Sequence, residues 1–205
     1  VALLLMEIGV YKALEQTLAL YSNVAIAWVG ALVADLVINK PLGLRPQHIE
    51  FKRAHLYDIN PVGVGAMTIA TIVSISAFYG FFGPTAKALS AFVALAAASV
   101  TAPLIAWATG GKYYIARKPK RSWQNLEAIQ CCICEHSFEP EDMASCPAYA
   151  GPICSLCCSL DARCHDLCKP HARIGAQVSE TLGKALPEAS YTRINYQFGH
   201  YLGVL

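Results

Sequence analysis

Residues 61–111 read PVGVGAMTIATIVSISAFYGFFGPTAKALSAFVALAAASVTAPLIAWATGG, and this stretch decides the fold. Val62–Gly83 is a window of 22 residues without a charge, and Ala88–Gly111 is a second window of 24. About 20 apolar residues in a helix cross the hydrocarbon core of a bilayer. Asn60-Pro61 is typical of a helix start, and Gly83-Pro84 predicts a tight turn between the windows. The two windows are therefore expected to form a transmembrane helical hairpin.

A third span is predicted over residues 17–38, and residues 1–16 are expected to be a partial span or an amphipathic connector. Asp35 is the one acid within a predicted span. An intramembrane carboxylate is by default a candidate for ion or proton coupling. Because Lys40 follows five residues later, at the expected interface, structural anchoring of Asp35 is the favoured interpretation.

The composition supports a membrane protein. Of the 205 residues 55% are hydrophobic and only 15% are charged, and the mean hydropathy is +0.40. Soluble domains carry about 25% charged residues, so a free-standing cytosolic enzyme and a disordered chain are both disfavoured. The net charge of +2 gives no reason to expect a nucleic-acid partner. Because the chain begins and ends in apolar runs, it is expected to be an internal piece of a longer protein.

Lysine and arginine indicate the orientation. Residues 39–61 carry four of these residues and residues 112–121 carry five, whereas the intervening turn has only Lys87. Basic segments next to spans face the cytoplasm. Both segments are therefore expected to be cytoplasmic, with residues 39–61 forming a solvated loop.

All nine cysteines lie in a short block, QCCICEHSFEPEDMASCPAYAGPICSLCCSLDARCHDLCKPHAR, at residues 130–173. Cys131 and Cys134 form one C-x2-C knuckle, and Cys154 and Cys157 form another after 19 intervening residues. Two such turns can direct four sulfurs at one ion, and this spacing is typical of a four-cysteine zinc site. Cys164 and Cys168 are four residues apart and could complete a second site with Cys146 or with one of the histidines. The remaining candidate ligands are Cys132, Cys158, His136, His165 and His171.

Three interpretations of the cysteines stay open. Structural zinc, one or two ions, is favoured because the block has few large apolar residues with which to build a core. An iron–sulfur cluster or a thiol redox sensor is the second interpretation. A disulfide framework is the third, and it requires an oxidising compartment that the predicted cytoplasmic placement does not provide.

The membrane segments resemble a known family. ALVADLVINK (residues 31–40) and HLYDINPVGVGA (residues 55–66) are similar to the late spans of nucleobase–cation symporters, the purine/cytosine permease family, which carry an Ala-Asp pair and then a Leu-Tyr loop. More specifically, residues 50–67 and GKYYIARKP (residues 111–119), followed by the cysteine block, resemble the permease-like region of bacterial hybrid sensor histidine kinases.

This resemblance implies a mainly α-helical membrane fold, the late helices of a symporter-like inverted-repeat bundle, followed by the cysteine-rich module. It implies a multi-pass protein of the bacterial inner membrane that senses or transports a small, nucleobase-like solute. Its partners would be the lipid bilayer and the downstream kinase and receiver domains of a two-component phosphorelay. No catalytic kinase motif, cofactor-binding residue or substrate-binding residue is assigned to this chain.

Four regions are expected along the chain. The first is a transmembrane region over residues 1–111, with spans at 17–38, 62–83 and 88–111. It is followed by a basic juxtamembrane linker over 112–130, the metal-binding module over 131–171, and an amphipathic helix with the start of another apolar segment over 172–205. Two other functions remain open. One is an active solute–cation symporter with a metal-binding appendage, and the other is a redox or metal sensor with a membrane anchor.

Overall fold

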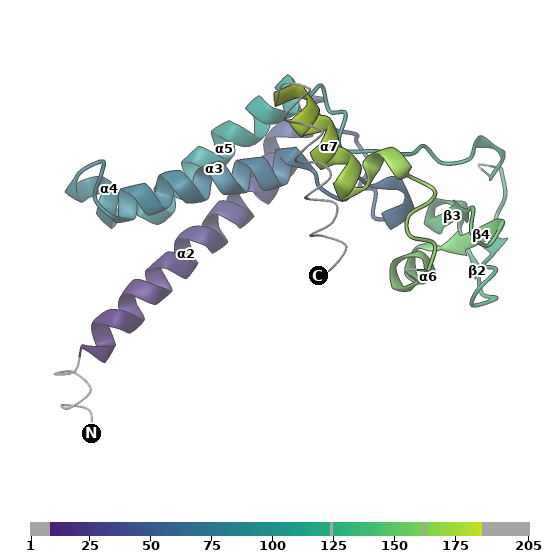
Figure 1. Cartoon of the computed structure of the whole chain (residues 1–205), viewed down its shortest axis with the longest axis horizontal. Helices are drawn as coiled ribbons and strands as arrows, with labels where there is room; N and C mark the ends of the chain where they lie inside the picture. Colours follow the sequence, from purple (N-terminus) through teal and green to yellow (C-terminus); the bar gives the residue numbers. More distant parts are fainter. Residues whose placement is uncertain (1–8, 124, 162, 186–205) are drawn as a thin grey trace. The chain divides into compact units, whose positions relative to one another are not determined.

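The computed structural model describes residues 9–123, 125–161 and 163–185, which fall into two compact units. The first unit lies within Val1–Ile49 and Asn60–Tyr113, and the second within Glu50–Ile59 and Tyr114–Leu205 (Figure 1). The chain therefore leaves the first unit at Ile49, returns to it at Asn60 and leaves it again at Tyr113.

The first unit is built on three long helices. They are α2 (Val10–Ala34), which continues as the π-helix η1 (Asp35–Asn39), α3 (Pro61–Phe78) and α5 (Ser90–Ala108), with the short α4 (Pro84–Ala88) before α5. All three are long and apolar enough to cross a membrane, in agreement with the three predicted spans. The predicted start of α3 is confirmed, because the Asn60 side chain accepts a hydrogen bond from the Val62 N–H at 3.0 Å and Pro61 is the first helical residue.

The helix boundaries differ from the predicted ones, by two or three residues at the ends of α5 and by more at the start of α2 and the end of α3. Helix α2 begins at Val10, seven residues before the predicted position 17, because Lys12 and Glu15 interrupt the hydropathy but are good helix formers. Helix α3 ends at Phe78 rather than at position 83, and Gly80 then adopts a left-handed φ of 90°. Of the predicted first segment, residues 1–8 lie outside the described residues.

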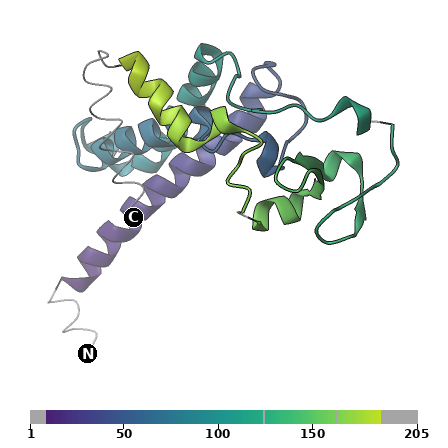
Figure 2. The same cartoon turned by 45° about the vertical axis from the view of Figure 1, so that its right-hand side comes forward.

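Small side chains mediate the packing of the three helices. Figures 1 and 2 show α3 and α5 side by side, with α2 packed against them through its C-terminal half. The buried positions recur about every four residues and are almost all small: Ala27, Gly30, Ala31 and Ala34 on α2, Ala66, Ala70, Ser74 and Ala77 on α3, and Ala94, Ala98, Ala102 and Ala106 on α5. Large apolar residues such as Ile72, Phe92 and Trp107 are exposed on the outside. This arrangement suits helices that pack closely inside lipid.

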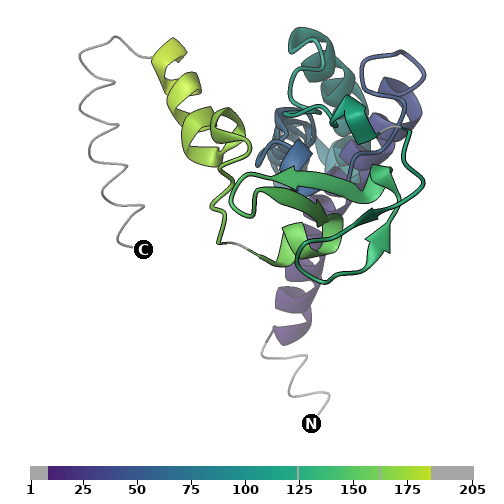
Figure 3. The ribbon, with the colours of Figure 1, turned by 90° about the vertical axis from the view of Figure 1, so that its right-hand side faces the viewer.

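The second unit contains two small antiparallel hairpins and short helices (Figure 3). Strand β1 (Ile129–Gln130) pairs with β2 (Ser137–Phe138), and β3 (Met143–Cys146) pairs with β4 (Gly151–Cys154) so that Met143 lies opposite Cys154. The other elements are η2 (Arg53–His55), η3 (Arg121–Trp123), η4 (Pro140–Asp142), α6 (Ser155–Leu160), η5 (Pro170–Ala172) and α7 (Ile174–Ala185). Helix α7 agrees with the amphipathic helix predicted at residues 172–190, whose end at Pro187 and following apolar segment lie outside the described residues.

The segment between α2 and α3 contributes to the second unit. Residues Glu50–Ile59 belong to it, and Lys52 and His55 are only 4% and 2% exposed. The expectation of a fully solvated loop is therefore wrong for this segment. Glu50 organises it, because one carboxylate oxygen accepts the Lys52 backbone N–H at 3.1 Å and the other lies 2.9 Å from His55 Nδ1.

The first prediction concerns the approach of α2 to α5. A Cβ placed on Gly30 would lie 3.1 Å from the Ala98 Cβ and 3.2 Å from the Leu95 Cδ1. Gly30→Val should therefore lower the unfolding free energy of the helical unit in detergent by about 1–3 kcal/mol, the cost typical of overpacking. Gly63→Val is the matched control, because a Cβ at Gly63 meets nothing within 4 Å. Equal loss of helicity by both variants during denaturant titration would contradict the close approach.

The second prediction concerns Glu50. Burial raises the pKa of Glu50, but hydrogen bonds from the His55 side chain and the Lys52 backbone, together with their charges, lower it overall to about 2 from a usual 4.5. Because the folded pKa lies below the unfolded one, the stabilisation is complete above about pH 4.5 and is lost as the pH falls toward 2.

Glu50→Gln should therefore destabilise the second unit at pH 6 by about 1–3 kcal/mol, the cost of leaving buried groups unpaired. The difference between wild type and variant should shrink as the pH falls from 5 to 3. Hydrogen exchange of residues 50–59, compared between wild type and variant at each pH, measures this difference. A difference independent of pH over this range would contradict the depressed pKa.

Candidate metal centre

The first knuckle is a tight turn that directs two sulfurs to one side. The Glu135 N–H donates to the Cys131 carbonyl at 2.9 Å, and Glu135 adopts a left-handed φ of 62° that closes the turn after Cys134. The Cys131 sulfur accepts the backbone N–H of Cys154 at 3.3 Å and that of Ile133 at 3.5 Å. Hydrogen bonds of this kind stabilise a thiolate and orient it as a ligand.

The second knuckle lies where β4 passes into α6. Cys154 is the last residue of β4 and the N-cap of α6, and its sulfur accepts the Cys157 N–H at 3.4 Å. Pairing of β4 with β3 holds Cys154 in place, and the Cys132 N–H donates to the Pro152 carbonyl of β4 at 2.9 Å. These backbone contacts bring the two knuckles together although 19 residues separate them in the sequence.

The four sulfurs of Cys131, Cys134, Cys154 and Cys157 all lie within 4.8 Å of one another. The sulfurs of Cys134 and Cys154 are 3.9 Å apart. Four thiolates at a zinc–sulfur distance of about 2.3 Å in a tetrahedron have sulfurs about 3.8 Å apart, whereas a disulfide requires about 2.05 Å. All four are free cysteines. The predicted four-cysteine group thus forms a cluster that could bind a metal ion, and no disulfide is formed within it.

The pKa values of these thiols differ. Burial raises the pKa of Cys131, but backbone N–H donors outweigh burial and lower it to about 6. Burial raises the pKa of Cys154, and burial together with the neighbouring thiols raises that of Cys157. A cluster in which one thiolate raises the pKa of the next favours a divalent cation, whose charge allows all four to ionise together.

The other predicted metal ligands are not part of this group. Cys146 and Cys164 are buried and Cys168 is partly buried, and all three pack in the same core as the four-cysteine cluster. Within the described part of the chain, no other three ligand atoms gather within 4.8 Å of one another.

Asp35 is held by polar contacts at the end of α2. Its carboxylate accepts a hydrogen bond from Arg45 at 2.6 Å and another from the Asn39 side chain at 2.9 Å. The Asp35 and Arg45 side chains are mostly buried. This geometry is that of a structural anchor, and the proposal that Asp35 couples an ion remains a prediction.

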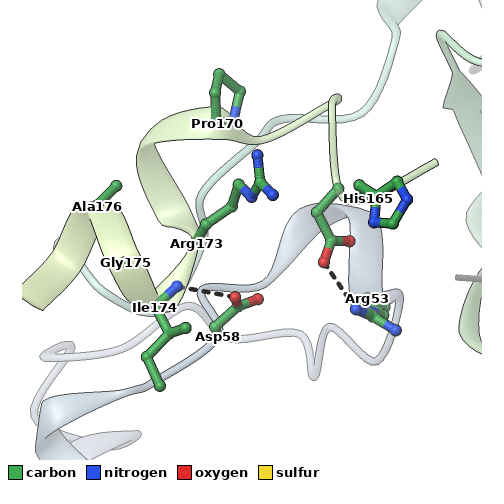
Figure 4. A pocket seen from close by; sticks show the side chains of 9 residues that line it. Arg53, Asp58, His165, Pro170, Arg173, Ile174, Gly175 and Ala176 are labelled. Carbon is green, nitrogen blue, oxygen red and sulfur yellow. Dashed lines mark hydrogen bonds and ion pairs between the residues drawn. The ribbon is translucent and has the colours of Figure 1, made fainter. Parts of the chain in front are cut away.

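Two ion pairs connect the Glu50–Ile59 segment to the cysteine-rich part of the second unit. Arg53 pairs with Asp166 at 2.7 Å, and Asp58 pairs with Lys169 at 2.7 Å. The second Asp58 oxygen accepts the Ile174 N–H at the start of α7 (Figure 4). An open cavity of about 550 Å³ lies beside these contacts. Figure 4 shows Arg173 and His165 among the side chains that line it.

Sequence reasoning missed these contacts. Lys169 is only 1% exposed, although it lies among polar residues after the last cysteine. Its partner Asp58 is 111 positions away in the chain. Neither residue belongs to a periodic pattern or a spacing motif, so a single sequence contains no signal that pairs them.

A third prediction follows from the four-cysteine cluster. Cys131→Ala should abolish metal binding at the cluster and release the β3–β4 hairpin, because the bound ion supplies much of the folding free energy of such small modules. Hydrogen exchange at the β4 amides should accelerate at least ~100-fold, and a strong chelator should have the same effect on wild type.

Cys132→Ala is the matched control, because Cys132 is exposed and lies outside the cluster. It should retain the slow exchange and the chelator sensitivity of wild type. Slow exchange in Cys131→Ala, or no response of wild type to the chelator, would contradict a structural metal.

Compared with family models, with curated proteins and with solved structures, the chain matches none of them. The features from which a function is inferred are therefore the three apolar helices, the four-cysteine cluster and the Glu50–Ile59 segment.

Proposed function

We propose that this chain is the membrane-embedded sensory part of a two-component histidine kinase, in which a cysteine-rich module stabilised by zinc couples the spans to downstream domains. Solute occupancy would favour one of two arrangements of the spans, and the module would transmit that difference as a shift of populations. The sequence resemblance to symporter-like sensor kinases supplies the solute class, a small nucleobase-like molecule.

The observation that carries the proposal is the position of the Glu50–Ile59 segment. It is continuous with α2 through residues 40–49 and with α3 through Asn60, yet it belongs to the unit that contains the cysteines. Three of its side chains contact that unit directly, since Lys52 donates to the Glu141 carbonyl, Arg53 pairs with Asp166 and Asp58 pairs with Lys169. A rearrangement of α2 against α3 would therefore act on the module through the backbone itself.

A bound metal ion would make the module rigid enough to transmit this displacement. A module whose hairpins have two and four residues per strand is deformable without a further constraint. A metal ion bound by four thiolates would hold β4, α6 and the first knuckle together as one rigid body. Displacement of Glu50–Ile59 would then move the whole module instead of being absorbed within it.

The test uses the full-length protein in proteoliposomes, with adenine, hypoxanthine, cytosine and uracil as probes. We expect at least one nucleobase to change autophosphorylation severalfold. Arg53→Gln and Asp58→Asn should strongly reduce that response while nucleobase binding persists, because they remove contacts of the connecting segment only.

Arg163→Gln is the matched control, since Arg163 also pairs with an aspartate, Asp161, but is exposed and lies outside the connecting segment. It should retain the response. Uptake of a labelled nucleobase with no change in autophosphorylation would instead identify a transporter with a metal-binding appendage. A response to metal or oxidant alone, abolished by Cys154→Ser, would identify a metal or redox sensor with a membrane anchor.

A further inference from the structure

Five cysteines remain outside the four-cysteine cluster, and their environments divide them into two groups. Cys132 is exposed, whereas Cys146, Cys158 and Cys164 are only 7–9% exposed and Cys168 is partly buried. These four, unlike Cys132, pack in the core of the second unit. We propose that Cys146, Cys158, Cys164 and Cys168 form a second metal site, which binds another thiophilic divalent ion of the zinc class.

The secondary structure separates the two sets of ligands. Cys157 and Cys158 are consecutive residues of α6, so their side chains point about 100° apart around the helix. Cys157 belongs to the first cluster, which directs Cys158 toward a different neighbour. Cys146 ends β3 at the far end of the hairpin from Cys154, since it pairs with Gly151 whereas Cys154 pairs with Met143. The hairpin and α6 would thus each contribute one ligand or more to both sites.

The elements that carry these thiols pack against one another. Helix α6, which contains Cys158, contacts β3, which ends at Cys146. Cys164 is buried in the same core, and Cys168 packs against it. The four thiols therefore share one core of the second unit.

The backbone between Cys164 and Cys168 forms a turn with two left-handed residues. His165 and Asp166 follow Cys164 with φ of 45° and 52°. Such conformations are unfavourable for residues other than glycine and persist only where the surroundings impose them. The Leu167 N–H donates to the Cys164 carbonyl at 3.0 Å, which closes a turn that places Cys168 near Cys164.

Metal binding would draw these sulfurs together. They do not form a group within 4.8 Å as the sulfurs of the first cluster do. A change of rotamer about χ1 moves a cysteine sulfur by about 3 Å, so side-chain rotation can close the site without refolding the backbone. Loss of the thiol protons on binding makes the closed state dependent on the ion.

The test measures bound zinc per chain in the full chain, purified without oxygen in detergent and freed of loosely bound metal. Wild type and the control Cys132→Ser should each bind two ions. Cys131→Ser with Cys134→Ser should bind one, and Cys164→Ser with Cys168→Ser should also bind one. One ion per wild-type chain, unchanged by the Cys164 and Cys168 substitutions, would overturn the proposal.

Cobalt substitution provides a second measurement in case a double variant fails to fold. Cys168→His keeps a ligand at that position, so it should bind two cobalt ions and shift part of the visible absorption from a four-sulfur to a three-sulfur, one-nitrogen spectrum. A pure four-sulfur spectrum from a single ion would contradict the second site. The readout is stoichiometry and spectrum, so it is independent of the proposed signalling role.

Discussion

The geometry of the second unit depends on four thiols that converge on one point. Its core has few large apolar side chains, with Met143 and Ile153 as the main ones, and the remaining buried positions are mostly alanines and cysteines. Full burial of such a side chain stabilises a fold by about 1.5–3 kcal/mol, which is small against the ordering of the 80 residues described in this unit. Metal ligation is the interaction that such modules use in place of a core. Because Cys154 ends β4 and caps α6, an ion bound at the cluster would fix a strand and a helix together.

The interior of the helical unit is stabilised in a different way from that of the second unit. Its interior consists mainly of alanine, glycine and serine, and most of its large apolar residues point outward. In water this pattern would leave most of the hydrophobic surface unburied, but in lipid the driving force is close packing of backbones, which small residues permit. Gly30 marks a close approach, because Ala98 and Leu95 fill the space where its side chain would be. The two units are therefore stabilised by different physics, and one substitution is expected to affect only one of them.

The sequence predicted the features that have local signatures. Apolar windows, two of them without a charge, identified the three spans, and the C-x2-C spacing identified the four residues of the cluster. The boundaries were less accurate. The mean hydropathy falls at Lys12 and Glu15, whereas α2 includes both residues. What sequence reasoning could not find is the membership of Glu50–Ile59 in the second unit. Positive charge near a span predicts a side of the membrane, but it does not predict that Lys52 and His55 are buried or that Asp58 meets Lys169.

The charges of the Glu50–Ile59 segment contribute specific geometry more than stability. Buried ion pairs contribute little net free energy, because desolvation offsets much of the attraction, but their geometry is specific. Asp58 contacts Lys169 with one oxygen and the first turn of α7 with the other, so a single side chain positions the segment against two parts of the module. A purely apolar contact would tolerate sliding, whereas the 2.7 Å ion pair between Asp58 and the buried Lys169 has a defined geometry. The segment before α3 is thus bound to the module by contacts suited to transmitting a displacement.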